Sequence, residues 1–212
     1  MKTAYELLKD SGRINRDVIA CEIGGEILDL TREVDENNCI KPLTFEDKNG
    51  KTVFWHTSSH VLAHAVKRLY PDAKLTIGPS IENGFYYDID SEISFTPEIL
   101  QKIEEEMQKI IKEDLKEERF VLTRDEAIKL MEERGEPYKV LLISRIETDE
   151  NISFYKHLFK HITVCAFEFL LIAFKHSLSP IFKFAYTRRT KFNGFNQYFA
   201  EFIICVFQSF FA

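Results

Sequence analysis

The stretch HTSSHVLAHAVKRLYPDAK, residues 56–74, decides the fold of this chain. Its apolar side chains recur at the three- and four-residue spacing of an amphipathic helix, and a proline soon afterwards marks the end. These side chains are Val61, Leu62, Ala65, Val66 and Leu69. If the helix begins at or before His56, a turn of about 100° per residue places His56, His60 and His64 on one stripe. The stripe then lies nearly opposite the apolar face, which argues against buried core histidines.

Two simpler interpretations of these histidines stay open. They can be exposed surface side chains, or His56 can belong to an N-terminal cap and not be helical at all. A HxxxH spacing can also hold zinc, but His56 and His60 supply only two ligands. The glutamate that follows the first histidine in the metalloprotease motif is missing as well. The sequence therefore assigns no metal site, and His56 and His60 are insufficient for one on their own.

A strand and a hairpin are expected after this helix. Residues 74–77 read as a strand, and IGPSIENGFYYD, residues 77–88, contains an Asn83-Gly84 pair typical of a type I′ turn. Alternation in the second strand of this hairpin divides its side chains between two faces. Phe85, Tyr87 and Ile89 share one face, and Tyr86, Asp88 and Asp90 share the other.

Two further helices are marked by their caps. Thr96 caps a helix that begins with Pro97. Its apolar stripe comprises Ile99, Leu100, Ile103, Met107, Ile110, Ile111 and Leu115. The second helix opens with the capping box of residues 123–126 and stops at Gly135. Residues 140–143 form an apolar run that we expect to be a strand.

The first fifty residues read as compact α+β material. Residues 4–8 resemble the end of a short helix that stops near Gly12. Val18–Ile23 and residues 26–30 flank Gly24-Gly25 and predict a hairpin, and residues 39–45 are a candidate for a further strand. The chain as a whole is therefore predicted to have an α+β fold, with a β-grasp-like piece as one option at its amino-terminal end.

Charge and composition change sharply along the chain. The formal net charge is −6, but residues 1–150 carry 21 Lys/Arg against 32 Asp/Glu, a balance of −11. Residues 151–212 carry 7 against 2, a balance of +5, and they contain 14 of the 19 phenylalanines, starting at Phe154. From about His157 no helical or strand period holds for long. Two different kinds of sequence are thus joined end to end.

Several classes of protein are disfavoured by composition. Residues 1–10 are short and polar, unlike a secretory signal, and the longest apolar run of the tail falls short of the ~20 residues that span a bilayer. The four cysteines lie far apart with no CxxC pair, which suits a reducing compartment. We therefore expect a cytoplasmic protein with no membrane partner.

The histidine stretch, the IGPSIENGFYYD segment and the run GEPYKV at residues 135–140 together resemble the editing domain of bacterial threonyl-tRNA synthetases. Upstream, residues 5–45 resemble the later part of the TGS domain, a β-grasp module that precedes the editing domain. The resemblance covers about residues 2–156. It implies a partial TGS domain at 1–48, a truncated editing (second additional) domain of the threonyl/alanyl-tRNA synthetase type at 49–156, and an unrelated Phe-rich tail at 157–212.

The family activates threonine with ATP, transfers it to tRNA(Thr), and hydrolyses mischarged seryl-tRNA(Thr) at a separate editing site. The resemblance implies that His56, His60 and Lys139 belong to that site and that Tyr87 lines its pocket. It also implies tRNA(Thr) as the partner. ATP and zinc belong to the family's catalytic domain, and dimerisation depends largely on domains outside this chain, so no cofactor is expected here.

Two departures from the family pattern bear on activity. The opening hairpin of the TGS module is missing, and so is the Asp-x-Cys-x-Gly-Pro-His segment that completes the editing site. We therefore expect a truncated threonine–tRNA ligase with an incomplete editing site that does not threonylate tRNA. The alternatives are a freestanding seryl-tRNA(Thr) deacylase, a non-catalytic RNA-binding or regulatory module, and a zinc-dependent hydrolase. The tail reads as a shifted or antisense reading frame, and an appended interaction segment is the rival explanation.

We predict that removal of the residues after Lys156 leaves the melting temperature unchanged and reduces self-association. The helical and strand periods of the preceding sequence do not continue into the tail. Its phenylalanines would therefore remain exposed as apolar patches. Thermal melting and gel filtration of residues 1–156 beside the full chain test this. A clearly lower melting temperature for the shorter chain, or a protease-resistant tail, would show that the tail is part of the structure.

Overall fold

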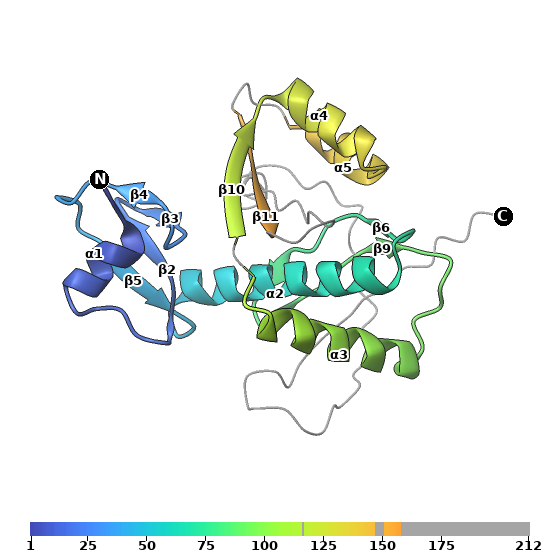
Figure 1. The fold of residues 1–212 in the computed structure, drawn as a ribbon, viewed down its shortest axis with the longest axis horizontal. Coiled ribbons are helices and arrows are strands. Elements are labelled where there is room, and N and C mark those ends of the chain that lie inside the picture. The colour runs from blue at the N-terminus through green and yellow to red at the C-terminus, as the bar shows by residue number, and fades with distance from the viewer. Residues whose placement is uncertain (116, 147–150, 158–212) are drawn as a thin grey trace. The chain divides into compact units, whose positions relative to one another are not determined.

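The computed structural model describes residues 1–115, 117–146 and 151–157. Among these residues it contains five helices and eleven short strands, so the predicted α+β class is confirmed (Figure 1). The chain divides into two compact units. The first comprises residues 1–58 with 80–83, and the second comprises residues 59–79 with those from 84 onward.

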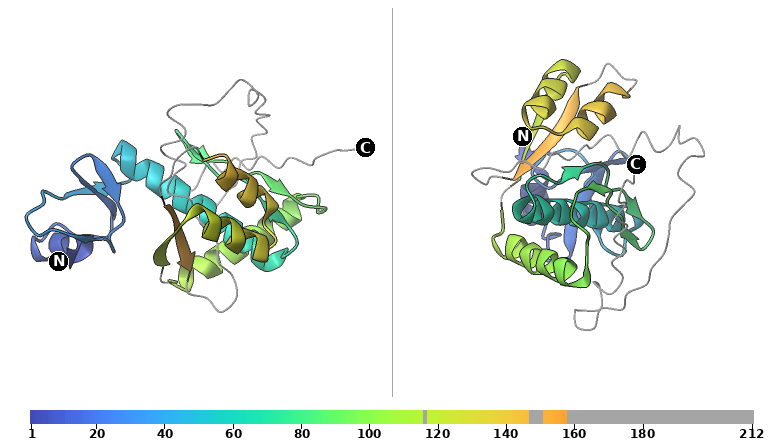
Figure 2. Two further views of the ribbon diagram at one scale, coloured as in Figure 1. Left: turned by 90° about the horizontal axis from the view of Figure 1, so that it is seen from above. Right: turned by 90° about the vertical axis from the view of Figure 1, so that its right-hand side faces the viewer.

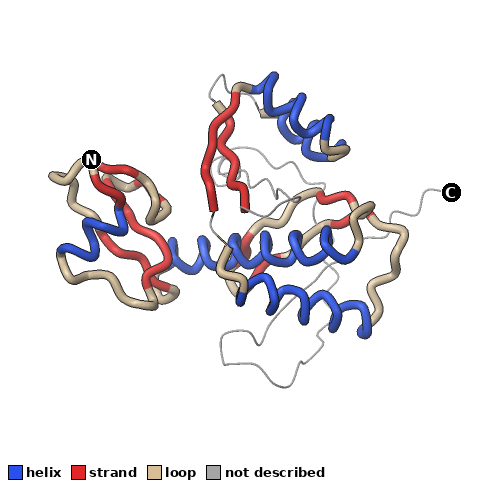
Figure 3. The backbone as a smooth tube through the Cα atoms, viewed as in Figure 1, coloured by secondary structure: helices blue, strands red, loops and turns tan. Residues whose placement is uncertain are grey.

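The first unit contains a helix and a three-stranded antiparallel sheet. Helix α1 (Ala4–Asp10) follows strand β1 (Lys2–Thr3), which pairs with β4 (Glu33–Val34). Thr3 and Glu6 form a capping box at the start of α1, so the helix begins at residue 4, where the sequence suggested an ending. The sheet has the order β3-β2-β5 (Figure 3). Its strands are β2 (Val18–Ile23), β3 (Glu26–Leu28) and β5 (Lys41–Thr44).

The predicted hairpin of this sheet is confirmed. Gly24 and Gly25 join β2 to β3 with φ angles of 60° and 91°, which a two-residue turn of the primed type requires. Strand β5 pairs with the other edge of β2, as expected for residues 39–45. Helix α1 and the strands enclose an apolar core of Ala4, Leu8, Cys21, Val34 and Ile40.

Helix α2 (Lys48–Leu69) begins more than two turns before His56. Gly50 makes this start possible, because a Cβ atom there would overlap the carbonyl of Thr44. The rings of Phe45, Phe54 and Trp55 pack edge to face with centroids 5.0 to 5.8 Å apart at this end of the helix. His56 is therefore fully helical, and its interpretation as a cap residue is wrong.

Short strands follow α2. Strand β6 (Lys74–Leu75) pairs with β9 (Ile89–Asp90), and β7 (Ser80–Ile81) pairs with β8 (Gly84–Phe85). The hairpin thus exists, but its turn consists of residues 82 and 83, so the predicted Asn83-Gly84 turn is wrong by one residue. Gly84 has a φ of 147° and begins the second strand. The predicted faces are confirmed, because Phe85, Tyr87 and Ile89 are each 2% exposed.

Helix α3 (Pro97–Lys112) has the predicted cap, since Thr96 Oγ1 accepts a hydrogen bond from the amide of Ile99. Its stripe buries Ile103, Met107 and Ile110, whereas Ile111 is 54% exposed and does not belong to the buried face. Arg68 of α2 makes two hydrogen bonds of 2.6 and 2.8 Å to the Glu113 carboxylate, which follows α3. These two hydrogen bonds lower the pKa of Glu113 and connect α2 to the end of α3.

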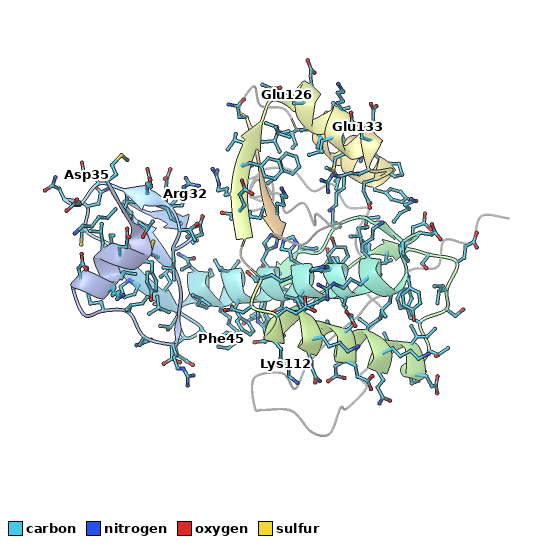
Figure 4. All side chains as sticks on the ribbon, viewed as in Figure 1. Arg32, Asp35, Phe45, Lys112, Glu126 and Glu133 are labelled. Atoms are coloured by element: carbon cyan, nitrogen blue, oxygen red, sulfur yellow. The ribbon has the colours of Figure 1, made fainter. Side chains whose placement is uncertain are left out.

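The last described elements form a small α+β layer. Strand β10 (Glu117–Leu122) pairs antiparallel with β11 (Ile152–His157), and helices α4 (Arg124–Glu133) and α5 (Pro137–Ser144) pack on them (Figures 1 and 2). Their shared core comprises Ala127, Met131, Ile143, Ile152 and Phe154. Glu126 and Glu133 lie near the two ends of α4 (Figure 4).

The predicted strand at residues 140–143 is wrong, because these residues lie in α5. Gly135, with a φ of 64°, ends α4, and Pro137 then occupies the first turn of the next helix. The apolar run is too short for its period to distinguish a strand from a helix. The Phe-rich tail predicted at 157–212 lies outside the described residues, apart from His157 at the end of β11.

We predict that Thr123→Ala destabilises α4 by about 1 kcal/mol, the usual cost of losing an N-cap. Thr123 and Glu126 form a complete capping box, with the Thr123 amide 2.9 Å from Glu126 Oε2. Urea unfolding and hydrogen exchange of the α4 amides measure the loss. Lys129→Ala on the exposed side of α4 is the matched control. Equal exchange rates in the two variants would contradict the predicted cap.

Candidate functional site

The three histidines of α2 do not share one environment. His56 and His60 are half-buried, whereas His64 is fully buried and accepts a hydrogen bond of 3.1 Å from Arg68 Nε. The expectation that the whole stripe lies away from the core is therefore wrong for His64. Residues 62–66 are all buried, because α2 is covered on most of its circumference there. His64 is a core histidine, and only His56 and His60 remain candidates.

Helix α5 places Lys139 in the interior of the second unit. This lysine is 7% exposed, and its Nζ donates a 2.6 Å hydrogen bond to the carbonyl of Thr76. The preceding residue, Tyr138, donates a 2.7 Å hydrogen bond to Asp90 Oδ2, which raises the pKa of Tyr138. Two consecutive α5 side chains thus bind the β6–β9 region. Lys139 is therefore not an exposed surface lysine.

An ion pair holds the first turn of α5 in place. Glu136 precedes the helix and lies 2.8 Å from Lys67 Nζ of α2 through its Oε1. The same ammonium donates to the carbonyls of Pro71 and Ala73, at 2.8 and 3.0 Å. All three Lys67 protons are thus used, which is what a largely buried ammonium requires. Sequence reasoning missed both residues, since neither stands out by spacing.

Tyr87 packs against the backbone of Gly78. The Tyr87 side chain is 2% exposed, and a Cβ atom at position 78 would overlap its ring. Ser59, the residue before His60, donates a 2.9 Å hydrogen bond from its Oγ to the carbonyl of Gly78. Tyr87 and the helical turn that carries His60 therefore meet at the same glycine.

The backbone of Asp88 also contacts this stretch of the chain. The Asp88 carbonyl accepts hydrogen bonds from the Thr76 amide at 3.1 Å and from Thr76 Oγ1 at 2.7 Å. Burial raises the pKa of the Asp88 carboxyl. The alternation of this segment places the Asp88 carboxyl on the face opposite Tyr87, so it is not assigned to the candidate site.

These contacts bring Lys139, Tyr87 and the neighbour of His60 to residues 76–78. His56 lies one turn before His60 on α2. The arrangement combines a buried ammonium and a phenol ring at one stretch of backbone, with the half-buried His60 next to the serine that contacts it. Such groups can orient a water molecule and stabilise a developing oxyanion.

Within residues 1–115, 117–146 and 151–157, no three or more His, Cys, Asp or Glu side chains gather closely enough to hold a metal ion. None of the helices in this described part is long and apolar enough to cross a membrane.

Curated relatives match most of the chain. Over 155 residues it is 55% identical to a threonine–tRNA ligase of Caldanaerobacter subterraneus subsp. tengcongensis, which is 73% of this chain and 24% of that relative. The ligase of Acetivibrio thermocellus is 58% identical over 69% of the chain and 23% of its own length. That of Clostridioides difficile is 59% identical over 66% of the chain and 22% of its own length. No family model matches the chain.

These identities place the matched part of the chain among the aminoacyl-tRNA synthetases, the ligases of protein biosynthesis. The chain belongs to the threonine–tRNA ligase family, as the resemblance of its histidine stretch and GEPYKV run predicted. It spans about a quarter of the length of the curated relatives that it matches.

We predict that the chain does not retain zinc tightly. Two imidazoles leave a tetrahedral ion short of protein ligands, since closed structural sites use four. After dialysis against a chelator, elemental analysis should find far less than one zinc per chain, with no difference between the wild type and His56→Ala. Stoichiometric zinc that disappears in His56→Ala would show that α2 provides part of a metal site.

Proposed function

We propose that the chain serves translation in the cytoplasm as an amino-terminal portion of a threonine–tRNA ligase, with residues 1–48 as a partial TGS domain. Residues 49–156 then form an editing domain, truncated, that receives the seryl ester of tRNA(Thr). The observation that carries this proposal is the convergence of Lys139, Tyr87 and the His60 turn on residues 76–78. Neither ATP nor zinc is assigned to this chain.

A separate editing site is needed because one binding pocket discriminates poorly between serine and threonine. Serine differs from threonine by one methyl group, and a pocket gains only about 1–3 kcal/mol of discrimination from such a group. A second site that hydrolyses the wrong ester raises fidelity beyond that limit. Translation therefore benefits from a hydrolytic pocket on the same protein that charges the tRNA.

The proposed chemistry uses the side chains around residues 76–78. The His60 imidazole, with His56 one turn away, orients a water molecule toward the ester carbonyl. The Lys139 ammonium, buried and held by the Thr76 carbonyl, provides the positive charge that stabilises the oxyanion. The edge of the Tyr87 ring packs against Gly78, and we assign this side chain to the lining of the proposed site.

The proposed site is incomplete in this chain. The Asp-x-Cys-x-Gly-Pro-His segment implied by the family resemblance does not occur in the 212 residues. Groups that act as a unit lose most of their joint rate when part of the unit is missing. We therefore propose that the chain recognises the seryl ester but hydrolyses it slowly. A non-catalytic RNA-binding module is less favoured, because residues 1–150 carry a balance of −11.

The test separates binding from hydrolysis. Calorimetry measures the binding of a non-hydrolysable amide analogue of 3′-seryl-adenosine, and release of serine from seryl-tRNA(Thr) measures hydrolysis. We expect the analogue to bind and each of Lys139→Met and His60→Ala to weaken it about tenfold, as loss of a charge-assisted contact does. Lys129→Met, the same change at an exposed position of α4, should leave binding unchanged. Hydrolysis should hardly exceed the rate in buffer.

Two outcomes would contradict this proposal in different ways. If the analogue does not bind, or if all three variants bind it as the wild type does, the second unit is not an editing site. If seryl-tRNA(Thr) is hydrolysed far faster than in buffer and His60→Ala abolishes that rate, the site is complete and the chain is a freestanding deacylase.

A further inference from the structure

Three consecutive carbonyls at residues 76–78 each accept a hydrogen bond from a different part of the second unit. The Thr76 carbonyl accepts from Lys139 Nζ at 2.6 Å. The Ile77 carbonyl accepts from the Asp88 amide at 3.0 Å. The Gly78 carbonyl accepts from Ser59 Oγ at 2.9 Å. We name residues 76–78 the carbonyl segment.

Each of these donors is a proposed site residue or the covalent neighbour of one. Lys139 itself comes from α5, Asp88 follows Tyr87 between β8 and β9, and Ser59 precedes His60 in α2. The carbonyl segment lies between β6 and β7, outside the regular strand pairs, so its carbonyls are available to these donors. The carbonyl segment therefore holds in place Lys139 and the backbone positions that carry Tyr87 and His60.

Gly78 is closely packed on its α-carbon. A Cβ atom there would overlap the Tyr87 ring and would lie 3.1 Å from Ser59 Oγ. Any side chain at this position has to displace the tyrosine, the serine or the backbone between them. A glycine at 78 is thus required by close packing, with no unusual φ angle involved.

Ser59 differs from its neighbour Ser58 in what it binds. Ser59 is fully buried and donates across to the carbonyl segment, whereas Ser58 Oγ donates at 2.8 Å to the Phe54 carbonyl of its own helix. Loss of the Ser58 hydroxyl removes a bond inside α2. Loss of the Ser59 hydroxyl removes a bond between α2 and the segment that also holds Lys139. The two adjacent serines are therefore a matched pair for an experiment.

We propose that Ser59 and Gly78 are positioning residues of the editing site, which set His60, Tyr87 and Lys139 relative to one another through the carbonyl segment. The functional meaning of this inference rests on the proposed function, whereas its structural content does not. Removing the Ser59 hydroxyl leaves the Gly78 carbonyl short of a donor and frees the segment to shift. Because the same segment accepts from Lys139, the shift reaches the ammonium as well as the imidazole.

The experiment compares Ser59→Ala, Ser58→Ala and Gly78→Ala in the full chain. Imidazole and tyrosine ring resonances, assigned by NMR, report on His60 and Tyr87 without any ligand. We expect Ser59→Ala to shift both sets of resonances, and Gly78→Ala to shift those of Tyr87 most. Ser58→Ala should leave the Tyr87 resonances in place. The seryl-adenosine amide should bind about tenfold more weakly to Ser59→Ala and unchanged to Ser58→Ala.

The proposal is overturned if Ser59→Ala lowers the melting temperature but leaves the His60 and Tyr87 resonances where they are, since Ser59 would then be structural only. It is also overturned if Ser58→Ala shifts these resonances as much as Ser59→Ala does. Failure of the wild-type chain to bind the amide would instead refute the editing function. In that case the NMR comparison still decides whether Ser59 and Gly78 position the two side chains.

Discussion

Backbone carbonyls that lie outside a regular sheet need donors from elsewhere, and the fold of the second unit follows from how residues 76–78 meet this need. Their donors come from a lysine, a backbone amide and a serine on three separate elements. The strands around them are only two residues long and supply little pairing of their own. Side chains of α2 and α5 therefore donate the hydrogen bonds that a neighbouring strand would donate in a larger sheet. As a result, the residues proposed to act on the ester lie next to those that form the structural hydrogen bonds, as His60 does to Ser59.

Local signals allowed much of the fold to be predicted. The caps at Thr96 and Thr123 and the Gly24-Gly25 hairpin depend on residues within one turn of each other, so the sequence contains their cause. The failures were of a different kind. The apolar run at residues 140–143 suits either secondary structure; in the fold it is helical, and Val140 and Ile143 pack into the core that α5 shares with β10 and β11. Strand β10 was not predicted, because its partner β11 lies some thirty residues further along the chain.

The candidate site divides in the same way. His56 and His60 could be singled out by spacing, but Lys139 and Tyr87 were found only through the family resemblance. Ser59, Gly78 and the Lys67–Glu136 pair were missed, because each matters through a contact with a residue distant in sequence. A serine in a helix or a glycine before a proline is common in any sequence. Their roles become visible only when the tertiary contacts are known.

The histidines of α2 show why a periodic pattern alone does not define a site. His60 and His64 stand four residues apart and point from the same side of one helix, yet His64 is fully buried and His60 is not. The difference arises from Arg68, one further turn along, which donates from Nε to His64 and from its other nitrogens to Glu106 and Glu113. The pKa values of both carboxyls are lowered, which favours their charged forms. Arg68 therefore has charged partners within the protein. With this network closing the carboxyl-terminal end of α2, His64 serves the packing of α2 on α3. The chemistry proposed for the stripe therefore ends at His60. There the hydrogen-bond partners of α2 change from Glu106 and Glu113 to the backbone of residues 76–78.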